Sequence, residues 1–241
     1  MVDDPNRAYP YYGLIGTAFA VLLAFVVLIS FQSYNQGKSG AETEAVALTE
    51  MYRTGEFFPQ GQREEFAGEV VCLGRASVAE WPAMSDSERN PDVDEWVSLL
   101  RETTASFDTL TPAQQAAFSH LLTEEDQRAT GRRERLSEAD PAVTPPVWFT
   151  LLLGGLTVIL GTLVFADRRE SFKVQAALMA GVTVMVVTGL SLVWFLDHPY
   201  RDASGSIQPV ELRRSLEIME ASHRGLPIPC NEAGTPPVQP A

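Results

Sequence analysis

Apolar residues gather in three windows of the chain that contain no Asp, Glu, Lys or Arg: Gly13 to Phe31, Val147 to Ala166 and Ala176 to Leu196. Each window holds about 19–21 residues, the length that a helix needs to cross roughly 30 Å of hydrocarbon. Buried helices of soluble proteins rarely run so long without a charge, so the pattern predicts three membrane-spanning helices. Aromatic residues of the kind that favour the headgroup zone lie at the ends of these windows: Tyr11, Tyr12, Trp148, Trp194 and Tyr200.

The first window has the position of a signal sequence but not its form. Its apolar run is longer than the hydrophobic region of a signal peptide, and no A-x-A-like cleavage site follows in "ISFQSYNQG". We therefore expect an uncleaved signal anchor.

Outside the windows, apolar residues recur at the spacing of amphipathic helices. The stripes are Ala41, Ala45, Leu48 and Tyr52; Phe66, Val70, Leu73, Ser77 and Trp81; Val93, Trp96, Val97 and Leu100; Phe118, Leu121 and Leu122; and, after the third window, Leu212, Leu216 and Met219. The segment 33–145 therefore predicts about four short helices, which an antiparallel bundle buries most simply. One further helix ends at Gly225, and we expect the Pro-rich "GTPPVQPA" to be disordered.

Three short motifs have the form of helix starts. Asn90 precedes Pro91, an N-cap followed by proline at the first helical position. "TPAQ", which begins at Thr111, and "SDSE" at 85–88 both have the spacing of a capping box.

The distribution of basic residues predicts the orientation. Arg7 lies before the first window, and Arg168, Arg169 and Lys173 lie in the loop between the second and third. The positive-inside rule places these residues in the cytoplasm and the long segment outside. The expected fold is all-α: three transmembrane helices with an extracytoplasmic helical bundle.

This prediction divides the chain at definite boundaries. In order, it gives a cytoplasmic N-terminus (1–12), transmembrane helix (13–31), extracytoplasmic helical domain (32–146), transmembrane helix (147–166), cytoplasmic loop (167–175), transmembrane helix (176–196), and extracytoplasmic helix with a Pro-rich tail (197–241).

The long segment also carries most of the charge. It holds 21 Asp and Glu against 10 Lys and Arg, a net charge of −11 out of −13 for the chain. Such a surface repels phosphate backbones, so we expect no nucleic-acid partner. A solvated helical surface accounts for this charge, and the expected partners are membrane lipid and either itself or other membrane proteins.

The stretch "WFLDHPYRD" at 194–202 brings several polar side chains together where the third window ends. An aspartate beside a histidine can orient an imidazole for base catalysis, but adjacent residues point in different directions and no nucleophile motif accompanies them. Pro199 biases the preceding residue, His198, to an extended conformation, so a helix end is expected here. We interpret Asp197, Pro199 and Tyr200 as a membrane-exit motif.

No catalytic or cofactor motif stands out elsewhere. H-E-x-x-H, C-x-x-C, G-x-S-x-G and glycine-rich phosphate loops are missing from the sequence, and His120 and His223 are isolated. The sequence therefore predicts neither an enzyme, nor a cofactor, nor a metal site.

Small and hydroxylated residues lie inside the second and third windows. The candidate packing positions are Gly154, Gly155, Gly161, Gly181 and Gly189, with Thr157, Thr162, Thr183, Thr188 and Ser191 nearby. Small residues let helix backbones approach closely, which favours a packing seam between these two helices or between protomers. The alternative is a pore wall of threonine and glycine, although charged rings and filter carbonyls are not evident.

The two cysteines, Cys72 and Cys230, lie in segments that the predicted topology places on the same, outer side. An extracytoplasmic compartment permits disulfides, so we expect an intramolecular bond. The alternative is a buried, reduced Cys72 with Cys230 unpaired or bonded to another chain.

Three stretches carry a family resemblance: "AVLLAFVVLISFQSYNQGKSGAETEAVALTEMYR", "EWPAM" at 80–84, and "FLDHPYRDASGSIQPVELRRSLE". In order and spacing they resemble a bacterial bestrophin-like integral membrane protein family, a domain of unknown function. The resemblance implies a multi-pass protein of the bacterial inner membrane that is a homo-oligomeric, channel-like assembly. The alternative is an accessory or scaffold subunit of a larger envelope transporter or membrane complex.

Overall fold

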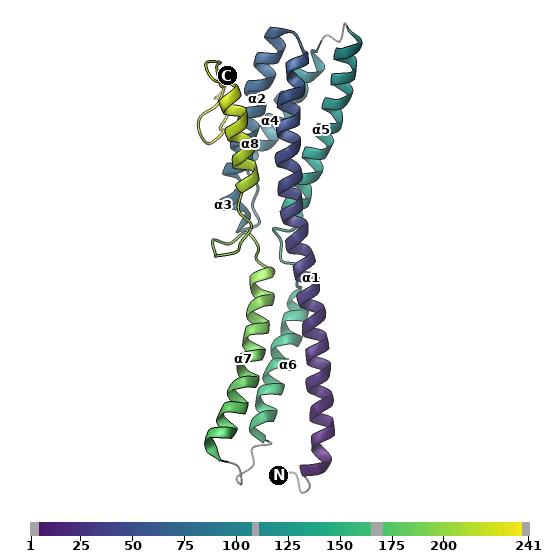
Figure 1. The fold of residues 1–241 in the computed structure, drawn as a ribbon, viewed down its shortest axis with the longest axis vertical. Coiled ribbons are helices and arrows are strands. Elements are labelled where there is room, and N and C mark those ends of the chain that lie inside the picture. Colours follow the sequence, from purple (N-terminus) through teal and green to yellow (C-terminus); the bar gives the residue numbers. More distant parts are fainter. Residues whose placement is uncertain (1–4, 108–110, 165–170, 238–241) are drawn as a thin grey trace. The chain divides into compact units, whose positions relative to one another are not determined.

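The computed structural model describes residues 5–107, 111–164 and 171–237, with side chains from residue 10 onward. Within these residues every regular element is a helix, which confirms the all-α prediction (Figure 1). The order is α1 (Pro5–Thr54), η1 (Gly55–Phe57), α2 (Gln60–Ala79), α3 (Trp81–Met84), α4 (Pro91–Ala105), α5 (Pro112–Ser137), α6 (Pro145–Val164), α7 (Phe172–Leu196) and α8 (Val210–Ser222).

The helices belong to two compact units. Unit 1 comprises Met1–Tyr34 and Pro141–His198, and unit 2 comprises Asn35–Asp140 and Pro199–Ala241. The long α1 contributes its first part to unit 1 and its last part to unit 2.

Unit 1 consists of the first part of α1 with α6 and α7. Each of these three helices is long and apolar enough to cross a membrane, as the three windows predict. A buried apolar core joins them: Phe19, Val26, Val143, Leu151, Val158, Val186 and Val193. Many other apolar side chains of the three helices point outward and are exposed, which suits a surface in contact with lipid or with other membrane helices.

The first helix continues beyond the window that predicts it. The sequence ends the span at Phe31, whereas α1 runs without a break to Thr54. A polar residue ends contact with hydrocarbon, but it does not end a helix whose backbone hydrogen bonds remain intact. The membrane boundaries therefore stay predictions.

Unit 2 is a helical bundle in which α2 packs against both α4 and α8. Its largest buried side chains come from every α-helix of the unit: Leu48, Met51, Phe66, Leu73, Met84, Trp96, Leu121, Arg135, Leu212 and Met219. Most of these positions lie on or beside the predicted stripes. Arg135 is the exception, because no apolar stripe announces it.

Two of the three predicted helix starts are confirmed. The Asn90 side chain accepts a hydrogen bond from the Asp92 amide at 3.1 Å, and Thr111 forms a complete capping box with Gln114. The prediction of a capping box at 85–88 is wrong. These residues close the end of α3 instead: Ser87 lies in the left-handed region at φ 59°, and the Ser87 and Glu88 amides donate to the carbonyl oxygens of Met84 and Ala83.

Candidate functional site

Four of the five candidate packing glycines lie where the helices of unit 1 approach one another. The nearest side chains are Phe19 at Gly154, Val186 at Gly155, Tyr12 at Gly161 and Leu23 at Gly189. A Cβ atom added at any of these four glycines would lie under 3.0 Å from its neighbour. Three of the neighbours belong to α1, so the glycines make room for α1 as well as for contact between α6 and α7. Gly181 has no atom within 4 Å, and a packing role for all five stays a prediction.

Both α1 and α6 expose large apolar side chains, but α1 also has a narrow strip of small exposed residues. This strip, the small face, consists of Gly13, Thr17, Ala20 and Ala24. On α6 a run of exposed leucines forms the bulky face: Leu152, Leu153, Leu156, Leu160 and Leu163. Small faces allow close helix association in a membrane, whereas bulky aliphatic faces suit lipid.

Asp197, directly after the last residue of α7, is a buried hydrogen-bond acceptor. Its side chain is 2% exposed, and its two carboxylate oxygens accept from the Val143 amide at 2.8 Å and from Trp148 Nε1 at 3.0 Å. It therefore joins the end of α7 to the start of α6. The sequence places this charge at a solvated exit and misses the contact, because both partners lie about fifty residues away.

The residues that follow Asp197 make separate contacts, and of the exit motif Pro199 accepts a hydrogen bond from the Ile207 amide at its carbonyl oxygen, at 2.8 Å. His198 Nδ1 lies 3.0 Å from the Trp194 carbonyl oxygen, within unit 1. Tyr200 belongs to unit 2, where its hydroxyl donates to the Arg135 carbonyl at 3.0 Å and its ring meets Trp81 edge to face. These contacts are structural, and a role at the membrane surface stays a prediction.

Unit 2 contains a buried ion network centred on Arg135 of α5. Its guanidinium is fully buried and donates to Glu44 Oε2 of α1 at 2.8 Å and to Glu80 Oε2 at 2.9 Å. The Met84 sulfur accepts a further bond, and the Trp81 ring lies under the guanidinium at 4.7 Å. One side chain thus connects α1, α5 and the junction of α2 and α3.

Glu80 has a second arginine. Arg132 Nη2 donates to Glu80 Oε1 at 2.8 Å and also reaches Asp94, while the Asn90 amide donates to Glu80 Oε1 at 3.0 Å. Burial alone would raise the pKa of Glu80, but its hydrogen bonds and the two arginine charges outweigh burial and lower it. The carboxylate is therefore charged at neutral pH.

Two glycines let this network form. A Cβ atom at Gly40 of α1 would lie 2.7 Å from the Gly131 carbonyl oxygen, and one at Gly131 of α5 would lie 2.6 Å from the Glu44 amide nitrogen. Both contacts are to backbone, so only glycine permits this crossing distance. One turn further along each helix, Glu44 and Arg135 then meet. Sequence reasoning missed these residues, although two glycines on charged amphipathic helices were a visible signal.

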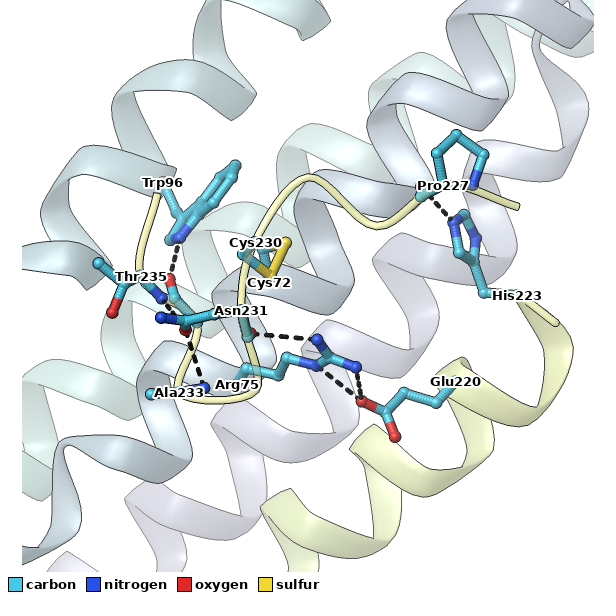
Figure 2. Close-up of a disulfide and its surroundings, with 11 residues drawn as sticks. Cys72, Arg75, Trp96, Glu220, His223, Pro227, Cys230, Asn231, Ala233 and Thr235 are labelled. Carbon is cyan, nitrogen blue, oxygen red and sulfur yellow. Dashed lines mark hydrogen bonds and ion pairs between the residues drawn. A yellow bond between two sulfur atoms is a disulfide. The ribbon is translucent and has the colours of Figure 1, made fainter. Parts of the chain in front are cut away.

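The C-terminal segment is attached to the bundle by a disulfide. Cys72 of α2 and Cys230 are bonded, with Cα atoms 5.8 Å apart. Figure 2 shows the segment passing over α2, where Arg75 contacts both Glu220 of α8 and the Asn231 carbonyl oxygen. These contacts place the tail firmly on α2.

The expectation that residues 234–241 are disordered is wrong for 234–237. Trp96 Nε1 donates to the Gly234 carbonyl oxygen, and the Thr235 amide donates to the Asn231 side chain at 2.9 Å (Figure 2). Gly234 has φ 79° and lies directly against the Ala76 backbone, a position that no side chain fits. Tertiary contacts override the Pro-rich composition here, and residues 238–241 lie outside the described chain.

The charged groups do not form an obvious metal centre. Across the part of the chain that the structure describes, no three His, Cys, Asp or Glu side chains are grouped so as to hold a metal ion.

Comparison with known proteins identifies the fold. A family model, the Bestrophin-like domain, matches residues 7–210. A crystal structure of a bacterial Bestrophin homologue from Klebsiella pneumoniae, carrying a point mutation, is 13% identical with a TM-score of 0.70 and covers 90% of this chain and 88% of its own. A second point mutant of that protein is also 13% identical, with a TM-score of 0.67, and the match covers 89% of this chain and 87% of the mutant. A crystal structure described as a membrane protein is 13% identical, with a TM-score of 0.66, and the match covers 95% of this chain and 88% of that protein.

Among curated proteins, none matches this chain by sequence. With the three apolar helices, the family and structural matches identify a membrane protein of this fold.

Proposed function

Since the chain belongs to the Bestrophin-like domain family, we propose that it forms a homo-oligomeric channel in the bacterial inner membrane. The observation that carries this proposal is the family match over residues 7–210, which includes all three apolar helices and most of unit 2. The protein acts without a cofactor and is not an enzyme. Its partners are lipid and further copies of itself.

The outward faces of unit 1 support a specific arrangement of the copies. The small face of α1 meets the same face of a neighbouring copy, and the bulky face of α6 meets lipid. The exposed Thr188 and Ser191 of α7 supply hydroxyl groups that can line a water-filled path.

The charge of unit 2 supports a preference for cations. The net charge of −11 over residues 33–145 raises the local cation concentration and lowers that of anions at any pore entrance nearby. This effect weakens as the ionic strength rises, because salt screens charges over about 10 Å at 0.1 M.

We propose that unit 2 lies outside the cytoplasm. The basic residues Arg7 and Lys173 support this orientation, and so does the Cys72–Cys230 disulfide, because such bonds persist in oxidising compartments. Arg168 and Arg169, on which the prediction also rests, lie outside the described residues. Reporters fused after Ser33 and after Gly225 should lie outside and one within 168–172 inside; the reverse pattern contradicts the proposed orientation.

Crosslinking tests the self-association. Thr17→Cys places a thiol on the small face of α1, and Leu156→Cys places one at a similar depth on α6, since Phe19 lies against Gly154 and Tyr12 against Gly161. Oxidation in membranes should link Thr17→Cys copies and leave Leu156→Cys monomeric. The purified chain, reconstituted in liposomes, should then conduct Na⁺ in preference to Cl⁻.

Native mass measurement separates this proposal from the alternative. A ring of identical chains after gentle extraction supports the channel. A single copy bound to foreign chains instead supports an accessory or scaffold subunit of a larger envelope transporter, and it contradicts the homo-oligomer.

A further inference from the structure

A groove in unit 2, of about 450 Å³, opens between α2, α4 and the disulfide-bonded tail. Its lining residues are Gly61, Glu64, Glu65, Glu69, Trp96, Leu99, Pro227, Pro229 and Pro237. Three of these are carboxylic acids and none is basic, while the other walls are largely apolar. The groove therefore combines negative charge with an aromatic and aliphatic surface.

Glu69 is the buried carboxylate of this groove. It is only 7% exposed, and its Oε1 accepts a hydrogen bond from the Thr103 hydroxyl of α4 at 2.9 Å. Its other oxygen, Oε2, is buried and has no hydrogen-bond partner within the described chain. A buried acceptor that lacks a donor is costly, and a carboxylate more so. The groove lacks a positive group at this point.

The charges around Glu69 point the same way. The pKa of Glu69 is raised to about 7, mainly by burial and further by the charges of Glu65 of α2 and Glu102 of α4, against the opposing hydrogen bond from Thr103. The residues that the tail contributes to the groove are prolines and carry no charge. At neutral pH the site is therefore poised to accept a cation in place of a proton.

The geometry indicates which kind of cation fits. No group of three ligating side chains is placed to hold a metal ion among the described residues. An ammonium group needs only a few acceptors at hydrogen-bond distance, and its alkyl chain can lie along apolar walls. Trp96 and Leu99 supply such walls beside Glu69, and Glu64 and Glu65 supply charge on the same helix, α2.

We propose that this groove binds a short aliphatic diamine, with one ammonium group on Glu69 Oε2, the alkyl chain against Trp96 and Leu99, and the second ammonium group near Glu64 and Glu65. The tail completes the site, because Pro227 and Pro229, which line the groove, come just before Cys230 and its bond to Cys72 of α2. Nothing in the channel proposal requires this site.

Titration calorimetry on the full-length chain in detergent tests the proposal, with 1,5-diaminopentane as probe at low salt. We expect binding at pH 8 and about tenfold weaker binding at pH 6, because the fraction of Glu69 that is deprotonated falls by that factor across its pKa. Glu69→Gln should weaken binding at least about tenfold and abolish the difference between the two pH values. Glu95→Gln, the same charge change at an exposed position of α4, should change the affinity less than about twofold.

A second variant guards against a folding defect in Glu69→Gln. Leu99→Lys places a tethered ammonium group on the wall of the groove and should prevent binding of the free diamine while the helical circular dichroism is retained. The proposal is overturned if the diamine does not bind at pH 8, or if Glu69→Gln binds it as well as the unchanged chain. It is equally overturned if 1-pentanol binds as tightly, or if Ca²⁺ displaces the diamine through Glu69. Because no ion flux is measured, either result leaves the channel proposal standing.

Discussion

Replacement of Arg135 by methionine tests whether the buried ion network stabilises unit 2. Arg135→Met keeps an unbranched apolar stem against Trp81 but removes the guanidinium. Glu80 then retains Arg132 and the Asn90 amide. Glu44 keeps nothing, because Arg135 is the partner of its Oε2 and its Oε1 has no hydrogen-bond partner in the described chain.

The expected cost follows from this asymmetry. Removing one partner of a buried ion pair costs about 3–5 kcal/mol, because an uncompensated charge remains. Both Glu44 and Arg135 are fully buried, so solvent does not reduce the effect. A second substitution, Glu44→Leu, removes the stranded carboxylate and should recover at least about 2 kcal/mol. The double variant is thus more stable than Arg135→Met alone.

Thermal unfolding of the purified chain in one detergent, followed by tryptophan fluorescence, measures the effect. For a chain of this size we expect Tm to fall by roughly 10 °C in Arg135→Met. Arg133→Met, an exposed position on the same helix, is the matched control and should change stability by less than about 0.5 kcal/mol. Equal losses in the two variants, or no recovery on adding Glu44→Leu, would refute the reasoning.

Three further outcomes are expected. Gly131→Ala should destabilise the chain by about 1–3 kcal/mol in the same unfolding assay, because its Cβ would lie 2.6 Å from an α1 backbone nitrogen. Gly61→Ala, in open space on α2, should be neutral or stabilising, and equal effects of the two variants would contradict the close crossing of α1 and α5. The pKa of Glu69 is raised from 4.5 to about 7 in the folded chain, so its contribution to stability should be greatest below about pH 4.5 and fall by up to about 3 kcal/mol as the pH rises through 7. This fall should be seen in the unchanged chain, whereas the profile of Glu69→Gln should be flat. After alkylation of the unreduced chain, its mass should show no label on Cys72 or Cys230, and two labelled thiols would show that the disulfide is absent. Reduction should lower stability by at most about 5 kcal/mol, the chain-entropy limit for a loop of 158 positions.

The pattern of apolar and polar residues along the chain was enough to predict most of the helices. Three charge-free windows identify the apolar helices, and Asn90 and Thr111 mark two helix starts, because capping depends on residues within one turn. Where several local signals competed, local reasoning failed. The motif at 85–88 has the form of a helix start, yet the chain needs those residues for a turn.

The contacts that define the candidate sites were decided by tertiary structure. Asp197 finds its partners about fifty residues away, and Arg135 meets Glu44 across a separation of 91 positions. No period or short motif records such pairings, since they depend on how closely two helix backbones approach.

The disulfide-bonded tail of unit 2 also shows what the sequence predicted and what only the tertiary structure decided. From the sequence alone we predicted that Cys72 and Cys230 lie on the same side of the membrane, and from its proline content that the tail is disordered. Only the tertiary structure shows that Gly234 lies against α2 and accepts a hydrogen bond from Trp96. Proline prevents regular backbone hydrogen bonds in this segment, so contacts with side chains hold it in place instead. The buried Glu69 likewise became a candidate site only when α4 and the tail closed over α2, because desolvation is a property of the packed chain and not of its residues taken singly.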